Sequence, residues 1–290
     1  MDAPPGGWRK NAESDATLMR RLHLEGAGVR LNCLDYEGDG GLPVLFIHGG
    51  AAHAHWWDFV AHRLTGVCRP FSIDLRGHGD SDRPPDGDYK VEAHIQDLAE
   101  VLRKWGHGKA VLVAHSGGCF VALPYAVSHP ESVAAMVIVE PRIHWPPELI
   151  KAASTRSERP HRRFATLEEA CASYRYIFPP IGADPADLAH VARQSFRQEP
   201  DGMWINKTER MAMSGIFDVS VMEYAARLRI PALVVRGDRS VHLTPEDAVK
   251  LTALANAPEA VVIRNAQHNV MLDNPEEVAQ ALRNFLATLP

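Results

Sequence analysis

The fold of this chain is decided by the stretch Val111-Leu112-Val113-Ala114-His115-Ser116-Gly117-Gly118-Cys119-Phe120. Its apolar beginning is typical of a buried parallel strand, and the apolar residues from Cys119 onward predict a helix. Ser116 stands at the turn between the two. The strand and the helix nearly touch there, so the residues around the serine must be small. The backbone N–H of Gly117 lies at the start of the helix, where it can stabilise a negative charge.

Composition limits the class of protein. The chain has 290 residues, 46% of them hydrophobic and 23% charged, which are values of a globular protein. A net charge of −5 argues against a nucleic-acid-binding surface. No apolar run reaches the ~18 residues that span a bilayer, and residues 1–15 lack the apolar core of a secretory signal. We therefore expect a cytoplasmic protein that binds neither nucleic acid nor membrane, as a monomer or homodimer.

The four cysteines lie far apart in the sequence and form no CxxC pair. This spacing favours free thiols over a metal site or a disulfide framework. We expect no metal and no organic cofactor.

Strands and helices alternate along most of the chain. Buried strands are predicted at 43–47, 71–73, 110–114, 134–139, 231–235 and 260–263, with two further strands at 20–25 and 29–36. This alternation predicts a doubly wound, mostly parallel α/β sheet with helices on both faces.

The alternation stops in one part of the chain. Residues 142–228 show helical pieces separated by proline-rich links and no buried strand, so we expect an inserted helical cap, or lid. Residues 1–17 are polar and are predicted to form a flexible arm. The predicted core therefore comprises residues 18–141 and 229–290.

The spacing of Ala114, Ser116 and Gly118 resembles the nucleophile elbow of the α/β-hydrolase fold family. The stretch departs from the family pattern at Ala114 and at Cys119, where glycine is common. Residues 74–81, Asp-Leu-Arg-Gly-His-Gly-Asp-Ser, match the segment that follows the fourth strand in this family, and we interpret them as structural. The resemblance implies an eight-stranded sheet with Ser116 as a nucleophile that forms a covalent ester.

Two further segments fit this resemblance. His48-Gly49-Gly50 ends a predicted strand, and in this family the residue after His-Gly donates an oxyanion hydrogen bond. Gly50 is therefore expected to act beside Gly117 in the oxyanion hole. His268 follows the last strand, where the family places its base, and imidazole can accept the serine proton near neutral pH.

The acid of the expected triad has two candidates. The strand at residues 232–235 usually precedes the acid in this family, but Val241 stands at that position. Glu140 directly follows six apolar residues of the preceding strand. This arrangement resembles a subset that includes zearalenone-type lactonases, so Glu140 is predicted to orient His268. Asp238 is the alternative.

The function that the resemblance implies is hydrolysis of a carboxylic ester or lactone, bulky and hydrophobic. A carbon–carbon bond hydrolase, a cofactor-free dioxygenase and a non-catalytic ligand receptor stay open as alternatives on the same fold. Six residues after the oxyanion loop and in the cap are candidates for the substrate pocket: His53, Trp145, Tyr176, Trp204, Met213 and Phe217.

Overall fold

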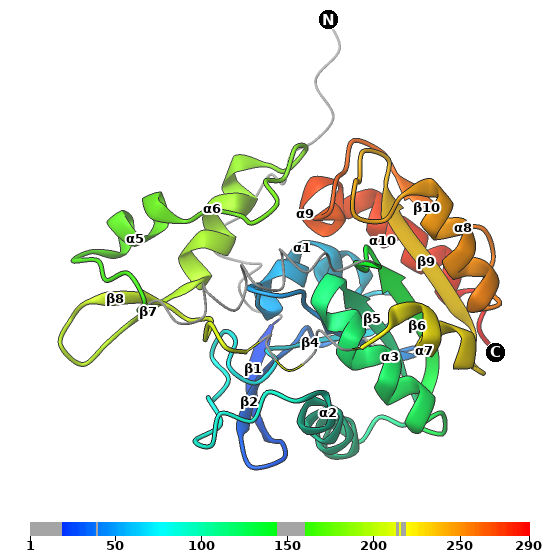
Figure 1. Ribbon diagram of the computed structural model, residues 1–290, viewed down its shortest axis with the longest axis horizontal. Coiled ribbons are helices and arrows are strands. Elements are labelled where there is room, and N and C mark those ends of the chain that lie inside the picture. Colours follow the sequence, from blue (N-terminus) through cyan, green and yellow to red (C-terminus); the bar gives the residue numbers. More distant parts are fainter. Residues whose placement is uncertain (1–18, 39, 144–159, 213–214, 216–218) are drawn as a thin grey trace, which may run out of the picture.

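The computed structural model describes residues 19–38, 40–143, 160–212, 215 and 219–290. Its main sheet has eight strands in the order β1-β2-β4-β3-β5-β6-β9-β10 (Figure 1). The strands are β1 Arg20–Glu25, β2 Arg30–Asp35, β3 Pro43–Ile47, β4 Arg69–Ile73, β5 Ala110–His115, β6 Val133–Val139, β9 Ala232–Gly237 and β10 Val261–Ile263. The strands from β4 to β10 in this order pair in parallel, whereas β2 pairs antiparallel with both β1 and β4. The predicted eight-stranded, mostly parallel sheet is confirmed.

Helices cover both faces of the sheet (Figure 1). One face carries α2 Val91–Trp105, α3 Cys119–Ser128, α7 Val221–Arg227 and α8 Pro245–Leu254. The other carries α1 Asp58–Ala61, α9 Val270–Asp273 and α10 Pro275–Leu286, with the short 3-10 helices η1 Ala54–Trp57 and η2 His62–Leu64 beside α1. Successive strand residues point to opposite faces, so Leu112 joins one hydrophobic cluster and Val113 the other.

Local signals set the ends of these helices. Gly106 ends α2 in the left-handed conformation, with φ of 72°, and its N–H donates to the carbonyl of Leu102. Pro275 begins α10 while the side chain of Asn274 caps the N–H of Glu277. None of the described helices combines the length and apolar character needed to cross a bilayer.

Four elements among the described residues form the insertion between β6 and β9: α5 Leu167–Ser173, α6 Pro185–Gln194, β7 Phe196–Gln198 and β8 Trp204–Asn206. The helix α7, which falls within the cap predicted at residues 142–228, packs with α3 in the core beside the sheet. The antiparallel pair β7 and β8 was not predicted. The helix α6 ends at Gln194, and β7 begins two residues later. Residues 199–202, Glu-Pro-Asp-Gly, form the connecting turn, with Gly202 at φ of 86°. Three-residue strands are too short to give a period-two pattern, which explains the difference. The expected arm at residues 1–17 lies outside the described residues.

Candidate active site

The turn after β5 holds Ser116 in an unusual backbone conformation. Its φ is 48°, in the left-handed region, and the residue begins the short 3-10 helix η3 Ser116–Gly118. A Cβ at Gly118 would lie 2.6 Å from the carbonyl oxygen of His48. A Cβ at Gly49 would lie 3.1 Å from the Cβ of Ser116. These two glycines therefore allow the loop after β3 to approach the serine closely.

His268 lies against the serine from the loop after β10. Its Nε2 is 2.9 Å from the Oγ of Ser116, a hydrogen-bond distance. The Nε2–H of His115 donates to the backbone carbonyl of His268 at 2.8 Å. The Phe178 ring packs edge-on against the His268 imidazole, with 4.7 Å between centroids. His268 is thus held through both its backbone and its ring.

Glu140 lies on the other side of the imidazole, directly after β6. Its Oε2 is 3.4 Å from the Nδ1 of His268, and its side chain is fully buried. Two donors hold the carboxylate: the Ser240 hydroxyl donates to Oε2 at 2.6 Å, and the Gly237 N–H donates to Oε1 at 2.7 Å. The carboxyl group is thereby fixed in one orientation toward His268.

Asp238, the alternative acid, makes a different contact. Its Oδ1 accepts a hydrogen bond from the N–H of Ala266 at 3.0 Å, two residues before His268. Asp238 thus braces the backbone of the loop that carries the histidine. Of the two candidates, Glu140 is the one that the structure brings to the imidazole.

Burial dominates the electrostatics of this group. It lowers the pKa of His268, as do the neighbouring His115, His242 and Arg142, so the imidazole is neutral near pH 7 and can accept a proton. Burial raises the pKa of Glu140 to about 8, against the hydrogen bonds from Ser240 and Gly237. Both shifts disfavour charge in the buried pair before a substrate reacts.

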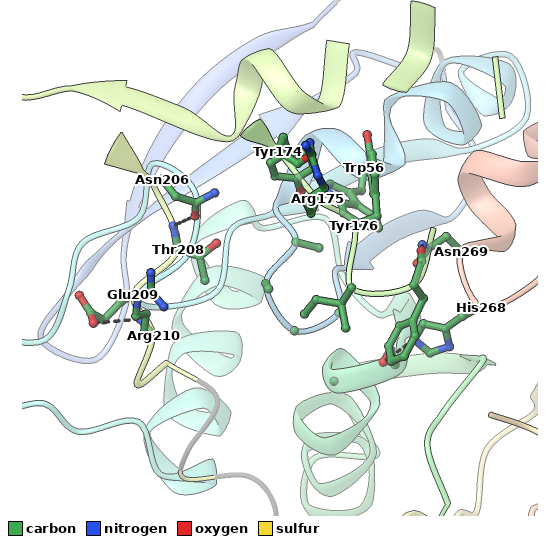
Figure 2. A pocket seen from close by; sticks show the side chains of 18 of the residues that line it. Trp56, Tyr174, Arg175, Tyr176, Asn206, Thr208, Glu209, Arg210, His268 and Asn269 are labelled. Carbon is green, nitrogen blue, oxygen red and sulfur yellow. Dashed lines mark hydrogen bonds between the residues drawn. The ribbon is translucent and has the colours of Figure 1, made fainter. Parts of the chain in front are cut away.

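A cavity of about 540 Å³ opens over Ser116 and His268. Gly50 and Gly117, the expected oxyanion donors, line it beside the serine. Aromatic side chains form much of the remaining wall, and Figure 2 shows Trp56, Tyr174 and Tyr176 gathered on one side of the cavity. A second, polar wall lies opposite His268 and comes from the insertion (Figure 2). It contains Asn206, Thr208, Glu209 and Arg210.

Comparison with known proteins agrees with this geometry. The model of the alpha/beta hydrolase fold family matches residues 43–178. A solved structure of E-2-(acetamidomethylene)succinate hydrolase superimposes with a TM-score of 0.81 at 24% identity, covering 93% of this chain and 100% of that one. This chain is an α/β-hydrolase-fold protein.

Curated relatives span nearly the same length. A 2-(acetamidomethylene)succinate hydrolase of Mesorhizobium japonicum is 27% identical over 94% of this chain and 96% of its own. The esterase Rv0045c of Mycobacterium tuberculosis is 29% identical over 84% of this chain and 83% of its own. The similarity thus includes the insertion as well as the sheet.

The pocket residues predicted for this α/β-hydrolase-fold protein have different placements. Tyr176 lines the cavity and packs on Trp56, with 5.6 Å between ring centroids. The prediction for His53 is wrong, because the side chain is buried away from the cavity and its Nε2 bonds the Ser195 hydroxyl at 2.9 Å. His53 stands directly before η1, and its side chain packs against the insertion through Ser195.

Trp204 also does not line the cavity. It lies in β8, where its backbone pairs with Phe164, and Phe164 is the aromatic residue that reaches the cavity wall. The other three predicted pocket residues lie outside the described part of the chain: Trp145, Met213 and Phe217.

The side chains of the site that the sequence did not predict include Ser240 and Arg142. Ser240 donates to Glu140, and its signal was its place in the loop after β9, beside the position where the family usually has its acid. Arg142 lies two residues after Glu140 and lines the cavity. Its position soon after a strand end was the available signal.

His55, Asp58 and His190 form a cluster of metal-ligand type, with their ligand atoms within 4.8 Å of one another. Their contacts fit a hydrogen-bond network. The Oδ2 of Asp58 lies 2.8 Å from the Nδ1 of His55 and 2.8 Å from the Nε2 of His190. The guanidinium of Arg21 lies 3.3 Å from the Nε2 of His55, which places the imidazole proton on Nδ1, facing Asp58. A metal ion at Nδ1 would have to displace that proton.

Proposed function

We propose that this protein is a serine hydrolase that cleaves a carboxylic ester or lactone through an acyl-enzyme intermediate. The observation that carries this proposal is the 2.9 Å contact between the Ser116 hydroxyl and the His268 imidazole within a cavity of about 540 Å³. A serine hydroxyl is a weak nucleophile by itself, and a neutral imidazole at this distance is the base that activates it.

The proposed reaction has two halves. The Nε2 of His268 takes the proton of Ser116 as Oγ attacks the substrate carbonyl. The backbone N–H groups of Gly50 and Gly117 stabilise the resulting oxyanion. His268 then gives its proton to the departing alcohol, and an ester on Ser116 remains. Water, activated by His268, releases the acid by the reverse sequence.

Glu140 has the role of the triad acid in this mechanism. Its carboxylate faces the Nδ1 of His268, so it fixes the tautomer with the proton on Nδ1 and stabilises the imidazolium that forms during each transfer. Ser240 and Gly237 orient the carboxylate for this purpose. Glu140 follows β6, one strand earlier than the strand that usually precedes the acid in this family. This position resembles that of zearalenone-type lactonases and therefore favours a lactone among the possible substrates.

Relatives suggest which acyl bonds to include in a screen. One is named an esterase and another a 2-(acetamidomethylene)succinate hydrolase, so amides belong beside aryl esters and bulky lactones. The aromatic wall at Trp56, Tyr174 and Tyr176 supports a substrate with an apolar part.

The first prediction tests the nucleophile. A fluorophosphonate probe should label the wild-type protein, and Ser116→Ala should escape labelling and lose about 10³-fold or more in kcat on any ester that the wild type hydrolyses. Ser128→Ala, in the same helix–turn segment but outside the cavity, is the matched control and should be labelled like wild type.

Other outcomes of this experiment would favour other functions. Turnover that persists in Ser116→Ala would favour a reaction in which His268 acts on the substrate itself, as in carbon–carbon bond hydrolysis or cofactor-free oxygenation. Tight binding with no turnover in the wild type would favour a receptor.

A further inference from the structure

The described residues that line the cavity include more positively than negatively charged side chains, although the whole chain has a net charge of −5. Among the described lining residues, four are arginines and one is a carboxylate residue, Glu209. The Oε2 of Glu209 is 3.3 Å from the Nε of Arg83, so that carboxylate is already neutralised. A cavity of this kind attracts anions over neutral molecules. The four arginines are Arg142, Arg162, Arg175 and Arg210.

Arg142 is the arginine tied most closely to the reacting groups. Its guanidinium lies 5.7 Å from the centre of the Phe178 ring, and Phe178 packs directly on the His268 imidazole. Its charge also contributes to the lowered pKa of His268. Arg210 lies instead on the polar wall across the cavity from His268 (Figure 2).

His242 orients the Arg142 guanidinium. One guanidinium N–H donates to the Nδ1 of His242 at 2.7 Å, and the His242 ring packs on His268 with 4.6 Å between centroids. Burial and the nearby Arg142 lower the pKa of His242 to about 4, so His242 is a neutral acceptor at physiological pH. This contact therefore fixes the direction of the guanidinium and leaves its positive charge in place.

The chemistry of a planar guanidinium suits a carboxylate. Two parallel N–H groups can bind both carboxylate oxygens, and such charge-assisted pairs are stronger and more directional than neutral hydrogen bonds. A partly desolvated wall beside an aromatic ring strengthens the attraction further. Arg142 is half-buried and stands beside Phe178, so it meets both conditions.

We propose that Arg142 binds a carboxylate group of the substrate, so that the preferred substrates are esters that are anions. This inference rests on the proposed function and specifies its substrate class. The carboxylate would lie near Arg142 while the apolar part of the same molecule packs against Trp56 and Tyr176.

Two matched pairs of substrates test the inference. One pair is the para-nitrophenyl half-ester of adipic acid and the para-nitrophenyl ester of heptanoic acid, which differ in a charge on the acyl side. The other is the hexanoate ester of para-hydroxybenzoic acid and that of its methyl ester, which differ in a charge on the alcohol side. We expect kcat/KM to favour the anionic member of at least one pair. In Arg142→Gln this preference should fall by about 10-fold to 100-fold, the range of a charge-assisted hydrogen bond.

Control variants separate Arg142 from charge in general. Arg239→Gln removes the same charge from a neighbouring loop residue that does not line the cavity, and should keep the preference. Arg142→Lys should retain part of it, because the charge stays and the bidentate geometry is lost. Wild type without any preference for the anion, or a preference unchanged in Arg142→Gln, would overturn the inference. A preference lost in Arg210→Gln and kept in Arg142→Gln would also overturn it.

A measurement on wild type alone covers the case in which Arg142→Gln does not fold. Hexanoate should inhibit hydrolysis of a neutral ester at concentrations about 10-fold or more below those of hexanamide. Equal inhibition by the two would count against the inference. The proposed function can fail separately: turnover that depends on Ser116 but shows no charge preference removes this inference alone.

Discussion

Ser116 and Glu140 each adopt a φ of 48° directly after a strand of the parallel sheet. An L-residue rarely takes this conformation, and it is stable only where the surrounding structure enforces it. Here it turns each side chain out of the strand direction at the same edge of the sheet, because parallel strands end together. The sharp turn after each strand thus accounts both for the strained backbone of Ser116 and Glu140 and for the meeting of their side chains around His268.

Glu140→Gln tests the role of the acid. We expect kcat/KM to fall by about 10³-fold to 10⁴-fold, because an amide can favour the wrong imidazole tautomer and does not stabilise the imidazolium. Asp238→Asn is the matched control and should lose less than about 10-fold, since Asp238 contacts the backbone at Ala266. Steady-state kinetics on one ester would decide, and the reverse ranking would assign the acid to Asp238.

The pH profile provides a second measurement on the same pair. The proposed mechanism requires an ionised Glu140 and a neutral His268, so it predicts that activity is lost as the pair gains one proton. Burial raises the pKa of Glu140 to about 8 and lowers that of His268, so the acid limb of wild-type kcat/KM should lie well above the ordinary glutamate value of 4.5.

In Glu140→Gln only His268 is left to titrate in the pair, and its lowered pKa should move the acid limb of the residual activity to lower pH. Profiles measured over about pH 5 to 9.5 would check this shift. An acid limb at the same pH in both proteins would show that the pair does not control it.

At the scale of elements, the loop after β4 is joined to α2 by a buried ion pair. The guanidinium of Arg76 binds both carboxylate oxygens of Asp97, at 2.7 Å and 2.8 Å, and both side chains are 2% exposed. Arg76 also donates to backbone carbonyls, including that of Asp88 at 2.8 Å. This explains, in physical terms, why the segment at residues 74–81 acts as structure outside the cavity.

Arg76→Met should destabilise the protein by about 3–5 kcal/mol, because Asp97 would remain buried without its cation. The double variant Arg76→Met with Asp97→Leu should recover most of that loss, because no charge is then left buried. Urea unfolding of the three proteins measures both effects. Arg103→Met, which breaks an exposed pair with Glu100, is the control and should unfold like wild type. A small loss in Arg76→Met would contradict this account.

Helices and strands with a long apolar or periodic hydrophobic pattern were predictable from the sequence, and strands of three residues were not. The strand at residues 110–114 and the helix beginning at Cys119 follow from apolar runs, and the structure places β5 and α3 there. The β7–β8 pair was missed because its strands have three residues each. The turn at residues 199–202, Glu-Pro-Asp-Gly, was its one usable signal.

The same difference applies to the candidate site: its residues at strand ends were predictable from the sequence, and those of the cavity wall were not. Ser116, His268 and Glu140 follow strands, so topology alone brings them to one edge. The cavity wall depends on side-chain packing in the insertion, where no period constrains direction. The sequence therefore does not predict that His53, which follows β3, bonds Ser195 of the insertion, or that Arg142 lines the cavity.

At the scale of the whole molecule, a hydrogen-bonded contact joins the insertion to the sheet domain. His190, on α6, bonds the carboxylate of Asp58, on α1, at 2.8 Å. Burial works against a charge on His190, but the hydrogen bond and charge of Asp58, with the charge of Asp187, raise its pKa. Burial likewise opposes charge on Asp58, but His55 and His190 outweigh it and lower the pKa of Asp58. The contact is therefore strongest while His190 is protonated.

Because folding raises the pKa of His190, its contact with Asp58 should stabilise the protein more at acidic pH than at alkaline pH. A raised pKa in the folded state adds stability that is fully present below the unfolded pKa of 6.5 and is lost as pH rises through the folded pKa. His190→Gln keeps a hydrogen-bond donor but removes the charge. Because the imidazole is 39% exposed, we expect a loss of only about 0.5–1 kcal/mol in the free energy of unfolding near pH 5.5. Near pH 8.5 the variant and wild type should coincide.

Urea unfolding at the two pH values measures this difference, and His23→Gln on the exposed face of β1 serves as the matched control. Equal losses at both pH values would mean that packing, and not protonation, accounts for the contribution of His190. Because Asp58 begins α1 and His190 lies on α6, a loss confined to acidic pH would show that the charge of one imidazole stabilises the contact between the insertion and the sheet domain.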